Sequence, residues 1–451
     1  MPTRLAPPAH PPTRTLAIVG GGFAGTTLAK ALDGRLPAGW QLLLISEESY
    51  TTFNPMLPEV VGAGVFPEHV VAPIREMLPG VRFVMGTVRA VESSSPRRLA
   101  CDTLAGPLEF ACDQLVLALG QRARLDLLPG MAEHALPLKL VGDAMHIRNR
   151  VLQALARIEL SYDPAQRRAL GHFVVVGGGF SGVEVAGALA DFVRSARRHY
   201  PKAQDAGLQV SLLHDGARLL PELPAALGEA AARSLSQRGV QVRCGAKVAR
   251  VSADGVELDD GEALASATVV CTVGTQPNPL VRTLGLSLQR GRIVTQADGR
   301  VDGVPGESSS GLWALGDCAA QPNARDGSTS PPTAQFAVAQ ARQLAANLLR
   351  TLRGQPTRPF SYQARGMMAT TGHLKGVATL FGLRLAGLPA WLLWRGYYLL
   401  RMPTFGRKLR IWVEWTWGLA FPLDITHLRF TRTADIDRAP PAASSSSSPT
   451  V

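Results

Sequence analysis

Two glycine-rich loops carry the residues whose types and spacing point most directly to chemistry. In such a loop the first glycine permits a tight turn, the third lets the backbone approach a pyrophosphate, and the last lets a helix pack on a strand. The N-terminus of the helix that follows then faces the phosphates. These positions are Gly20, Gly22 and Gly25 in the first loop and Gly177, Gly179 and Gly182 in the second. The sequence therefore predicts two dinucleotide sites.

An acidic residue after the second strand of such a unit binds the adenosine ribose. In the first unit we assign this role to Glu47, with Glu48 as the alternative. The second unit has His214 where the acid is expected and Asp215 one position later, so Asp215 is either the ribose ligand or only a turn former. Because Arg218 follows closely and can meet a 2′-phosphate, the choice between NADH and NADPH stays open.

Three later segments extend the nucleotide sites. Gly120 ends an apolar run where the backbone can close over the first nucleotide, and Gly274 is its equivalent after the second unit. Asp317 follows a further apolar run far along the chain and is either a ligand of ribitol hydroxyls or a helix cap. A cofactor that needs contacts so far apart suggests FAD. The helix expected over residues 333–350 would point its positive end, and Ala334 near its start, at this cofactor.

The elements that must position these residues are short apolar strands followed by Ala-rich helices, each pair flanking a glycine loop. We therefore predict an α/β fold with two Rossmann-type dinucleotide-binding domains, the second inserted in the first, and a C-terminal membrane-associating α segment. The expected division is a disordered arm over 1–14, an FAD-binding domain over 15–164 and 286–350, an NAD(P)H-binding domain over 165–285, a membrane-interface segment over 351–434 and a disordered tail over 435–451.

The late part of the chain has a distinct composition. The whole sequence has a net charge of +12, and residues 350–432 alone hold 13 basic and 2 acidic residues together with five of the seven Trp. Trp, Leu and Arg in amphipathic helices favour a membrane interface, so residues 385–432 are expected to bind lipid. The alternative is a homodimer interface built from the same aromatic residues. No apolar run is long enough to span a bilayer, and no nucleic-acid partner is expected.

Taken together, these motifs resemble the type II NADH:quinone oxidoreductases, within the two-dinucleotide-domain flavoproteins of the pyridine nucleotide-disulfide oxidoreductase-like family. The resemblance covers about residues 14–432 and rests on segments 18–25, 53–58, 117–120, 134–139, 176–184, 316–319 and 331–340. It implies that NADH, or NADPH, gives hydride to FAD and that a membrane quinone then takes two electrons without proton pumping. It also implies a peripheral location on the cytoplasmic face of the plasma membrane.

The resemblance implies roles for several side chains. Glu184, in the first helical turn after the second loop, would lie near the nicotinamide, although the helix dipole alone can explain an acid there. Pro55 would run beside the flavin. Gln335 and Gln340 match the quinone-site pattern AQxAxQ, but Gln340 comes one residue later than the strict form, and either Gln can simply be a helix surface residue. Lys375 can approach the flavin or pair with Glu184, or be only a solvated surface lysine.

The scattered cysteines weigh against related chemistries. No two of the five Cys lie within a CxxC or CxxxxC spacing, so a disulfide reductase, a sulfide-linked quinone reductase and a Cys-rich metal site are disfavoured, and no metal is expected. A ferredoxin-linked reductase is disfavoured by the apolar C-terminal end. A flavin-binding redox module without turnover remains the alternative from another functional class.

Overall fold

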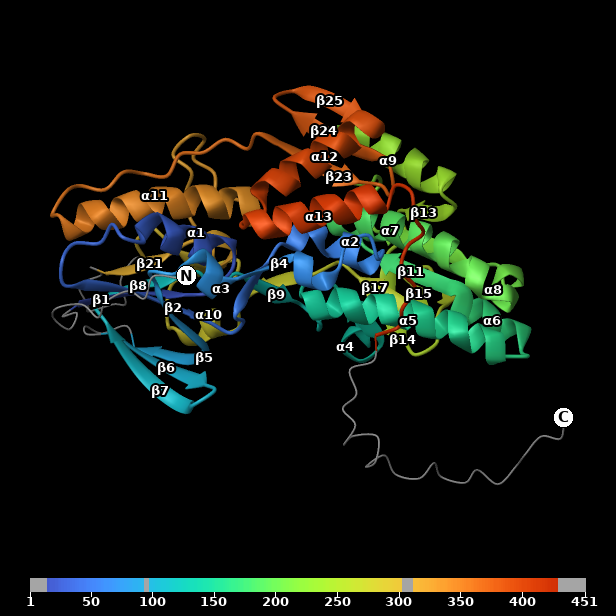
Figure 1. The fold of residues 1–451 in the computed structure, drawn as a ribbon, viewed down its shortest axis with the longest axis horizontal. Helices are drawn as coiled ribbons and strands as arrows, with labels where there is room; N and C mark the ends of the chain where they lie inside the picture. The colour runs from blue at the N-terminus through green and yellow to red at the C-terminus, as the bar shows by residue number, and fades with distance from the viewer. Residues whose placement is uncertain (1–13, 93–96, 302–310, 429–451) are drawn as a thin grey trace.

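The computed structural model describes residues 14–92, 97–301 and 311–428 (Figure 1). The predicted arm, apart from Arg14, and the predicted tail over 435–451 lie outside the described residues. So do residues 429–434 of the predicted membrane-interface segment.

The first sheet has seven strands in the order β21-β8-β1-β2-β5-β6-β7. The strands β21, β8, β1, β2 and β5 are parallel, and β6 and β7 extend β5 as antiparallel strands. Their bounds are β1 (Arg14–Val19), β2 (Trp40–Ser46), β5 (Arg82–Glu92), β6 (Arg97–Thr103), β7 (Gly106–Cys112), β8 (Gln114–Leu117) and β21 (Leu312–Ala314). Central parallel strands are buried on both faces and are therefore mainly apolar, as residues 16–19 of β1 are.

The second sheet consists of five parallel strands in the order β10-β17-β11-β12-β13. Their bounds are β10 (Ala135–Pro137), β17 (Thr268–Cys271), β11 (His172–Val176), β12 (Gln209–His214) and β13 (Val240–Cys244). All five precede β21 in the chain, although β21 belongs to the first sheet. The α/β class predicted from the sequence is confirmed.

Helices place the two glycine loops beside these sheets. In Figure 1, α1 (Phe23–Leu32) and α11 (Ala334–Leu352) lie along one face of the first sheet. The helices α7 (Phe180–Ala196) and α9 (Ala225–Gln237) pack with the second sheet, and α5 (Val141–Leu160) and α6 (Pro164–Gly171) lead from β10 into β11. The short helix α2 (Leu57–Val61) packs closely on α7, because a Cβ at Gly62 would meet the Ala188 side chain at 3.0 Å.

Smaller elements complete the described chain. They are β3 (Tyr50–Thr52), η1 (Asn54–Met56), η2 (Pro67–His69), β4 (Val71–Pro73), α3 (Ile74–Met77), β9 (Gln121–Ala123), α4 (Met131–His134), η3 (Arg197–His199), α8 (Pro201–Asp205), β14 (Val248–Ser252), β15 (Gly255–Leu258), β16 (Ala263–Ala265), β18 (Thr275–Pro277), α10 (Leu280–Thr283), β19 (Leu288–Gln289), β20 (Arg292–Val294), η4 (Gly316–Cys318) and β22 (Ala319–Ala320).

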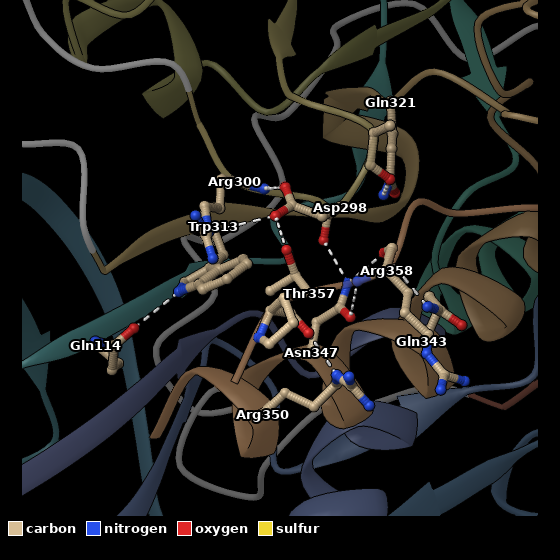
Figure 2. Close-up of polar contacts among 12 residues, drawn as sticks. Gln114, Asp298, Arg300, Trp313, Gln321, Gln343, Asn347, Arg350, Thr357 and Arg358 are labelled. Carbon is tan, nitrogen blue, oxygen red and sulfur yellow. Dashed lines mark hydrogen bonds and ion pairs between the residues drawn. The ribbon is translucent and has the colours of Figure 1, made fainter. Parts of the chain in front are cut away.

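After α11 the chain crosses to the other half of the molecule (Figure 1), along a linker anchored by the contacts drawn in Figure 2. Asn347, fully buried on α11, donates to the carbonyls of Asp298 and Arg358 and accepts from the Arg358 amide. The Thr357 hydroxyl donates to the Asp298 carboxylate at 2.6 Å, and Arg300 pairs with the same carboxylate. Buried polar groups that are all satisfied fix a single backbone path. The linker therefore enters the C-terminal segment from a defined place.

The C-terminal segment forms a small antiparallel sheet followed by two helices. The strands are β23 (Gly366–Thr370), β24 (Gly376–Leu380) and β25 (Leu383–Ala386), and the helices are α12 (Leu388–Arg401) and α13 (Phe405–Trp417). The sequence predicts the helices but not the sheet. Among the described residues, no helix is long and apolar enough to cross a bilayer.

Candidate active site

The two glycine loops have the same geometry. Gly20 has φ +115° and Gly177 has φ +113°, a region that residues with a side chain rarely adopt. A Cβ at Gly25 would lie 1.8 Å from the Gly20 carbonyl oxygen, and one at Gly182 would lie 1.7 Å from that of Gly177. Each of these glycines is therefore required by the close approach of its helix to the preceding turn.

The third glycine of each loop borders open space. Gly22 and Gly179 are the N-caps of α1 and α7, and a Cβ at either would meet nothing within 4 Å. Neither helix has a side-chain cap or an acidic residue in its first turn. Each N-terminus thus presents free backbone N–H groups to a cradle that a side chain would fill, and a dinucleotide pyrophosphate fits this donor set.

The predicted ribose ligands lie at the ends of the second strands. Glu47 follows β2, is exposed and forms an ion pair with Arg122 of β9. Asp215 follows β12; its exposed carboxylate lies 3.2 Å from Nδ1 of His214, whose ring packs against the second glycine loop. The Arg218 guanidinium donates to the carbonyls of residues 221 and 223, so its described contacts are structural.

The remaining predicted contacts of the nucleotide sites lie at turns. Gly120, with φ +64°, borders open space, and Pro55 lies in η1. Gly274, with φ +78°, packs instead against Leu127 and accepts from the Arg124 amide at 3.0 Å. Gly274 thus helps to fix the segment in which the chain passes between the two halves of the molecule.

Asp317 lies in η4 between two basic residues that sequence reasoning did not single out. Burial raises its pKa, and Lys139 and Arg292 oppose that rise. Burial lowers the pKa of Lys139 while Asp317 opposes the change. The Asp143 carboxylate accepts the Lys139 amide at 2.8 Å and so holds this residue at the start of α5. Lys139 belongs to segment 134–139, which carries part of the family resemblance, so the sequence did offer a signal for it. No sequence feature pointed to Arg292.

The two predicted glutamines of α11 have different surroundings. Gln340 is 2% exposed, and its Oε1 accepts the Gly316 amide at 2.8 Å. It therefore fixes the turn that carries Asp317. Gln335 is half-buried at the N-terminal end of the helix, beside Ala334, and donates to the Gly366 carbonyl at 2.7 Å. These contacts favour a positioning role for Gln340 and leave Gln335 as the acceptor-site candidate.

Glu184 is a buried carboxyl group held by the C-terminal segment. It is 7% exposed, and its Oε1 accepts the Thr370 amide at 3.1 Å and Nε1 of Trp394 at 2.9 Å. Burial raises its pKa to about 8, and both hydrogen bonds oppose this rise. A pairing with Lys375, one of the alternatives left open by the sequence, is not among its described contacts, and Lys375 is exposed.

The first-turn position expected for Glu184 is wrong. The helix begins at Phe180, so Glu184 lies in the second turn, and the described first turn holds no acidic residue. Attraction to the helix dipole, which acts mainly in the first turn, is therefore a weak explanation for a carboxyl group at this position.

A second carboxyl group lies near Glu184, and a basic residue lies near that second group. Glu59 on α2 has its pKa raised by burial, and Arg395 of α12 opposes that rise. The Arg395 guanidinium lies 3.9 Å from the ring centroid of Trp391 and 4.6 Å from that of Trp415. This cation–π arrangement lets a partly desolvated guanidinium sit among aromatic rings. Sequence reasoning missed both charged residues.

A chain of edge-to-face aromatic rings links the first glycine loop to Glu184. Phe23 at the start of α1 contacts Phe53 with ring centroids 5.6 Å apart, and Phe53 contacts Tyr398 at 5.7 Å. Tyr398 contacts Trp394 at 4.8 Å, and Trp394 donates to Glu184. The site thus draws on both nucleotide units and on α12.

A separate cavity of about 430 Å³ lies between α5 and the β3–β4 strands, and no predicted site residue lines it. Its walls are mainly apolar and come from Tyr50, Pro67, Glu68, Val71, Val141, Gly142, Met145, His146 and Asn149.

Comparison with known proteins agrees with the geometry of two nucleotide cradles. Residues 14–341 match the family model of pyridine nucleotide-disulphide oxidoreductases. The chain belongs to this family. The type II NADH:quinone oxidoreductase relationship predicted from the motifs is confirmed.

The chain aligns with these relatives over nearly its whole length. It is 29% identical to a type II NADH:quinone oxidoreductase (Ndh) of Mycobacterium tuberculosis, covering 92% of this chain and 90% of that protein. It is 30% identical to the demethylphylloquinone reductase NdbB of a Synechocystis species, covering 89% and 95%. The solved structure of NDH2 from Plasmodium falciparum in complex with NADH has a TM-score of 0.84 at 18% identity, covering 92% of this chain and 99% of that one, and it supports the fold.

Proposed function

We propose that this chain oxidises NADH and reduces a membrane quinone with FAD as the resident cofactor, while bound to one face of the membrane. The observation that carries the proposal is the pair of glycine cradles on one chain, joined by a buried carboxyl group and aromatic residues of α12. The overall reaction is NADH + H⁺ + quinone → NAD⁺ + quinol. FAD, when bound, supplies a carrier that accepts a hydride and passes on two electrons.

The first cradle suits FAD. The N-terminus of α1 at Gly22 would receive the pyrophosphate, Glu47 the adenosine ribose, and Asp317 the ribitol hydroxyls. Lys139 beside Asp317 adds a positive charge that attracts an anionic group. The side-chain contact of Gln340 with Gly316 holds this turn in place.

The second cradle suits NADH. The N-terminus of α7 at Gly179 would receive the pyrophosphate and Asp215 the ribose, and Glu184 would lie on the nicotinamide side. A carboxyl group with a pKa of about 8 is mostly protonated near neutral pH and is suited to hold or release a proton there. The related NAD(P)H-ubiquinone oxidoreductase A1 of Solanum tuberosum keeps NADPH open as a second donor.

Gln335 is the proposed contact for quinone. Its amide is already oriented by the Gly366 carbonyl and by the Tyr362 hydroxyl, which donates to its Oε1 at 3.4 Å. An amide held in this way can use its remaining hydrogen-bonding capacity on a quinone carbonyl. The position at the start of α11 also brings Ala334 and the free helix N-terminus to the same place.

We propose that a lipid surface binds the exposed apolar faces of α12 and α13. Leu388, Leu392 and Leu400 recur at helical spacing on α12, and Phe405, Leu409, Trp412 and Val413 do so on α13; all are at least 48% exposed. The neighbouring Arg401, Arg407, Lys408 and Arg410 complement anionic headgroups. The cytoplasmic leaflet of a plasma membrane carries a negative surface potential, which supports a peripheral site on that face. The competing proposal is that a second copy of the chain binds the exposed face of α12 and α13.

The test of the function separates the two half-reactions. Purified protein should be yellow, lose its visible flavin band on anaerobic addition of NADH, and recover it when a short-chain ubiquinone is added. Protein that neither contains nor takes up FAD would overturn the proposal. A Gln335→Leu variant should be reduced by NADH at the wild-type rate but reoxidised by quinone about five- to tenfold more slowly, since an amide contact to the quinone carbonyl contributes roughly 1–1.5 kcal/mol. Equal loss of both steps contradicts its assignment.

A further inference from the structure

The indole of Trp394 joins the C-terminal segment to Glu184. Trp394 lies on α12, 210 residues after Glu184, and is 1% exposed. Its Nε1 donates to Oε1 of Glu184 at 2.9 Å, while the Thr370 amide of β23 donates to the same oxygen. Both described donors to this carboxyl group therefore come from residues 366–401, outside the two nucleotide units.

Packing fixes the orientation of this indole. Its ring lies 4.8 Å from the ring of Tyr398, one turn along α12, and 6.1 Å from the ring of Trp415 on α13. Trp415 in turn lies under the Arg395 guanidinium. Both C-terminal helices must be docked for the Nε1–H bond to point at Glu184.

The same helix exposes an apolar face to the outside. Leu388 is 48%, Leu392 56% and Leu400 75% exposed, whereas Trp391 and Trp394 on the other face are at most 4% exposed. One rigid helix of fourteen residues thus presents its exposed side to the surroundings and its buried side to Glu184.

We propose that Trp394 is a positioning residue that holds the Glu184 carboxyl group, so that docking of the C-terminal helices sets the proton affinity of the nicotinamide side of the site. The functional consequence rests on the proposed role of Glu184 in the reaction with NADH. The hydrogen bond itself does not depend on that role.

The electrostatic effect has a defined sign. An N–H donor to a carboxylate favours its charged form, so loss of the indole donor raises the proton affinity of Glu184. The groups that act on Glu184 from the packed elements are Glu59 of α2, which also favours protonation, and Tyr398 of α12, whose own pKa is raised by burial and by Glu184. Arg395 acts through Glu59.

The test replaces the indole without removing the ring. Trp394→Phe should shift the titration of the Glu184 carboxyl upward by about one pH unit, a tenfold gain in proton affinity, because hydrogen bonds to charged groups have this strength. The readout is the infrared carbonyl stretch of the protonated acid, identified as the band that Glu184→Gln removes. The matched control is Trp412→Phe, which changes an indole 54% exposed on α13 and should leave this band at its wild-type midpoint.

A second variant tests the same hydrogen bond if Trp394→Phe folds poorly. Incorporation of benzothienylalanine at position 394 replaces only the N–H by sulfur and keeps the shape of the side chain. The same upward shift is expected. A wild-type midpoint in either folded variant overturns the proposal.

The failure of the proposed function would look different. If Glu184→Gln is reduced by NADH as fast as the wild type at every pH, Glu184 has no part in hydride transfer, yet the titration shift of the Trp394 variants would still establish its positioning by α12. If Glu184→Gln is slowed, Trp394→Phe should move the pH midpoint of flavin reduction in the same direction as the infrared band, and Trp394→Phe added to Glu184→Gln should cause no further change.

Discussion

Glu184 and Glu59 are two carboxyl groups on facing helices, the first buried and the second half-buried, and desolvation raises the pKa of both. Removing a carboxylate from water costs free energy, so such a pair reduces the stability of the fold. Its presence is therefore better explained by a function than by a structural role. Perturbed acids of this kind concentrate at functional sites. The location beside the second glycine loop supports a role in proton handling.

The raised pKa of Glu184 predicts a pH-dependent stability. Because the folded value, about 8, exceeds the ordinary value of 4.5, the folded state binds this proton more tightly, and stability falls as pH rises through the interval between the two values. Glu184→Gln should remove this loss. Near pH 8 the variant should gain up to a few kcal/mol relative to the wild type, and near pH 4 the advantage should vanish. Thermal unfolding midpoints across this range provide the measurement; parallel curves for the two proteins would contradict it.

At the level of elements, the two loop–helix units predict separable losses. Gly22 and Gly179 both border open space, so a valine at either should leave the fold intact while it fills the pyrophosphate cradle. Gly22→Val should give nearly colourless protein. Gly179→Val should remain yellow but need at least about tenfold more NADH for half-maximal flavin reduction, since poor approach to the pyrophosphate removes more than 1.4 kcal/mol of binding. Absorption spectra measure the FAD content of each variant, and NADH titrations measure the concentration needed for flavin reduction. Loss of FAD from both variants would contradict the assignment of the cradles.

The C-terminal helices predict salt-sensitive membrane binding. Deleting residues 385–432 is a poor test, because Trp391, Trp394, Ile411 and Trp415 are buried in the core. Replacing Arg407, Lys408 and Arg410 by Gln keeps that core. The triple variant should bind anionic vesicles about a hundredfold more weakly, at roughly 1 kcal/mol per charge, with little change on neutral vesicles.

Vesicle co-sedimentation at several salt concentrations measures the difference. The alternative result is that the wild type does not bind vesicles and elutes as a dimer, while Trp412→Ser elutes as a monomer. In that case the exposed face binds a second chain instead.

The elements themselves show where sequence reasoning succeeds. The predicted glycine loops at 20–25 and 177–182 lead into α1 and α7, and the helix predicted over 333–350 overlaps nearly all of α11, because glycine loops and apolar runs are local signals. The contact of Trp394 with Glu184 joins residues 210 apart and depends on how α12 docks. Likewise, the pattern of α11 does not reveal that Gln340 faces the buried Gly316 amide while Gln335 faces the linker.

For the whole molecule, the end of the described chain acts as a strap along α5. The buried Arg148 donates to the Thr426 carbonyl at 3.1 Å and lies 3.7 Å from the Asp424 carboxylate. Asn149 donates to the Leu428 carbonyl at 2.9 Å and accepts its amide at 3.3 Å. These contacts hold the segment after α13 against the helix that leads into the second sheet.

Asn149→Ala should therefore loosen this strap. Loss of two partly buried hydrogen bonds should lower the free energy of unfolding by about 1–3 kcal/mol and speed proteolysis of the segment after residue 418. Gln153→Ala is the matched control on the same helix, because its contact with His427 is exposed and worth less. Equal proteolysis rates in the two variants would show that the strap depends on other contacts.

The position of β21 has a consequence for biosynthesis. This strand pairs with β8 but follows the whole second sheet in the chain, so a growing polypeptide carries β8 as an open, mostly apolar edge until residues 312–314 leave the ribosome. The strands of the second sheet end at residue 271 and can assemble first, because domains fold as units during translation. The half that contains the second sheet should thus mature before the half that contains the first sheet, and chains that stall between these points expose an edge prone to aggregation.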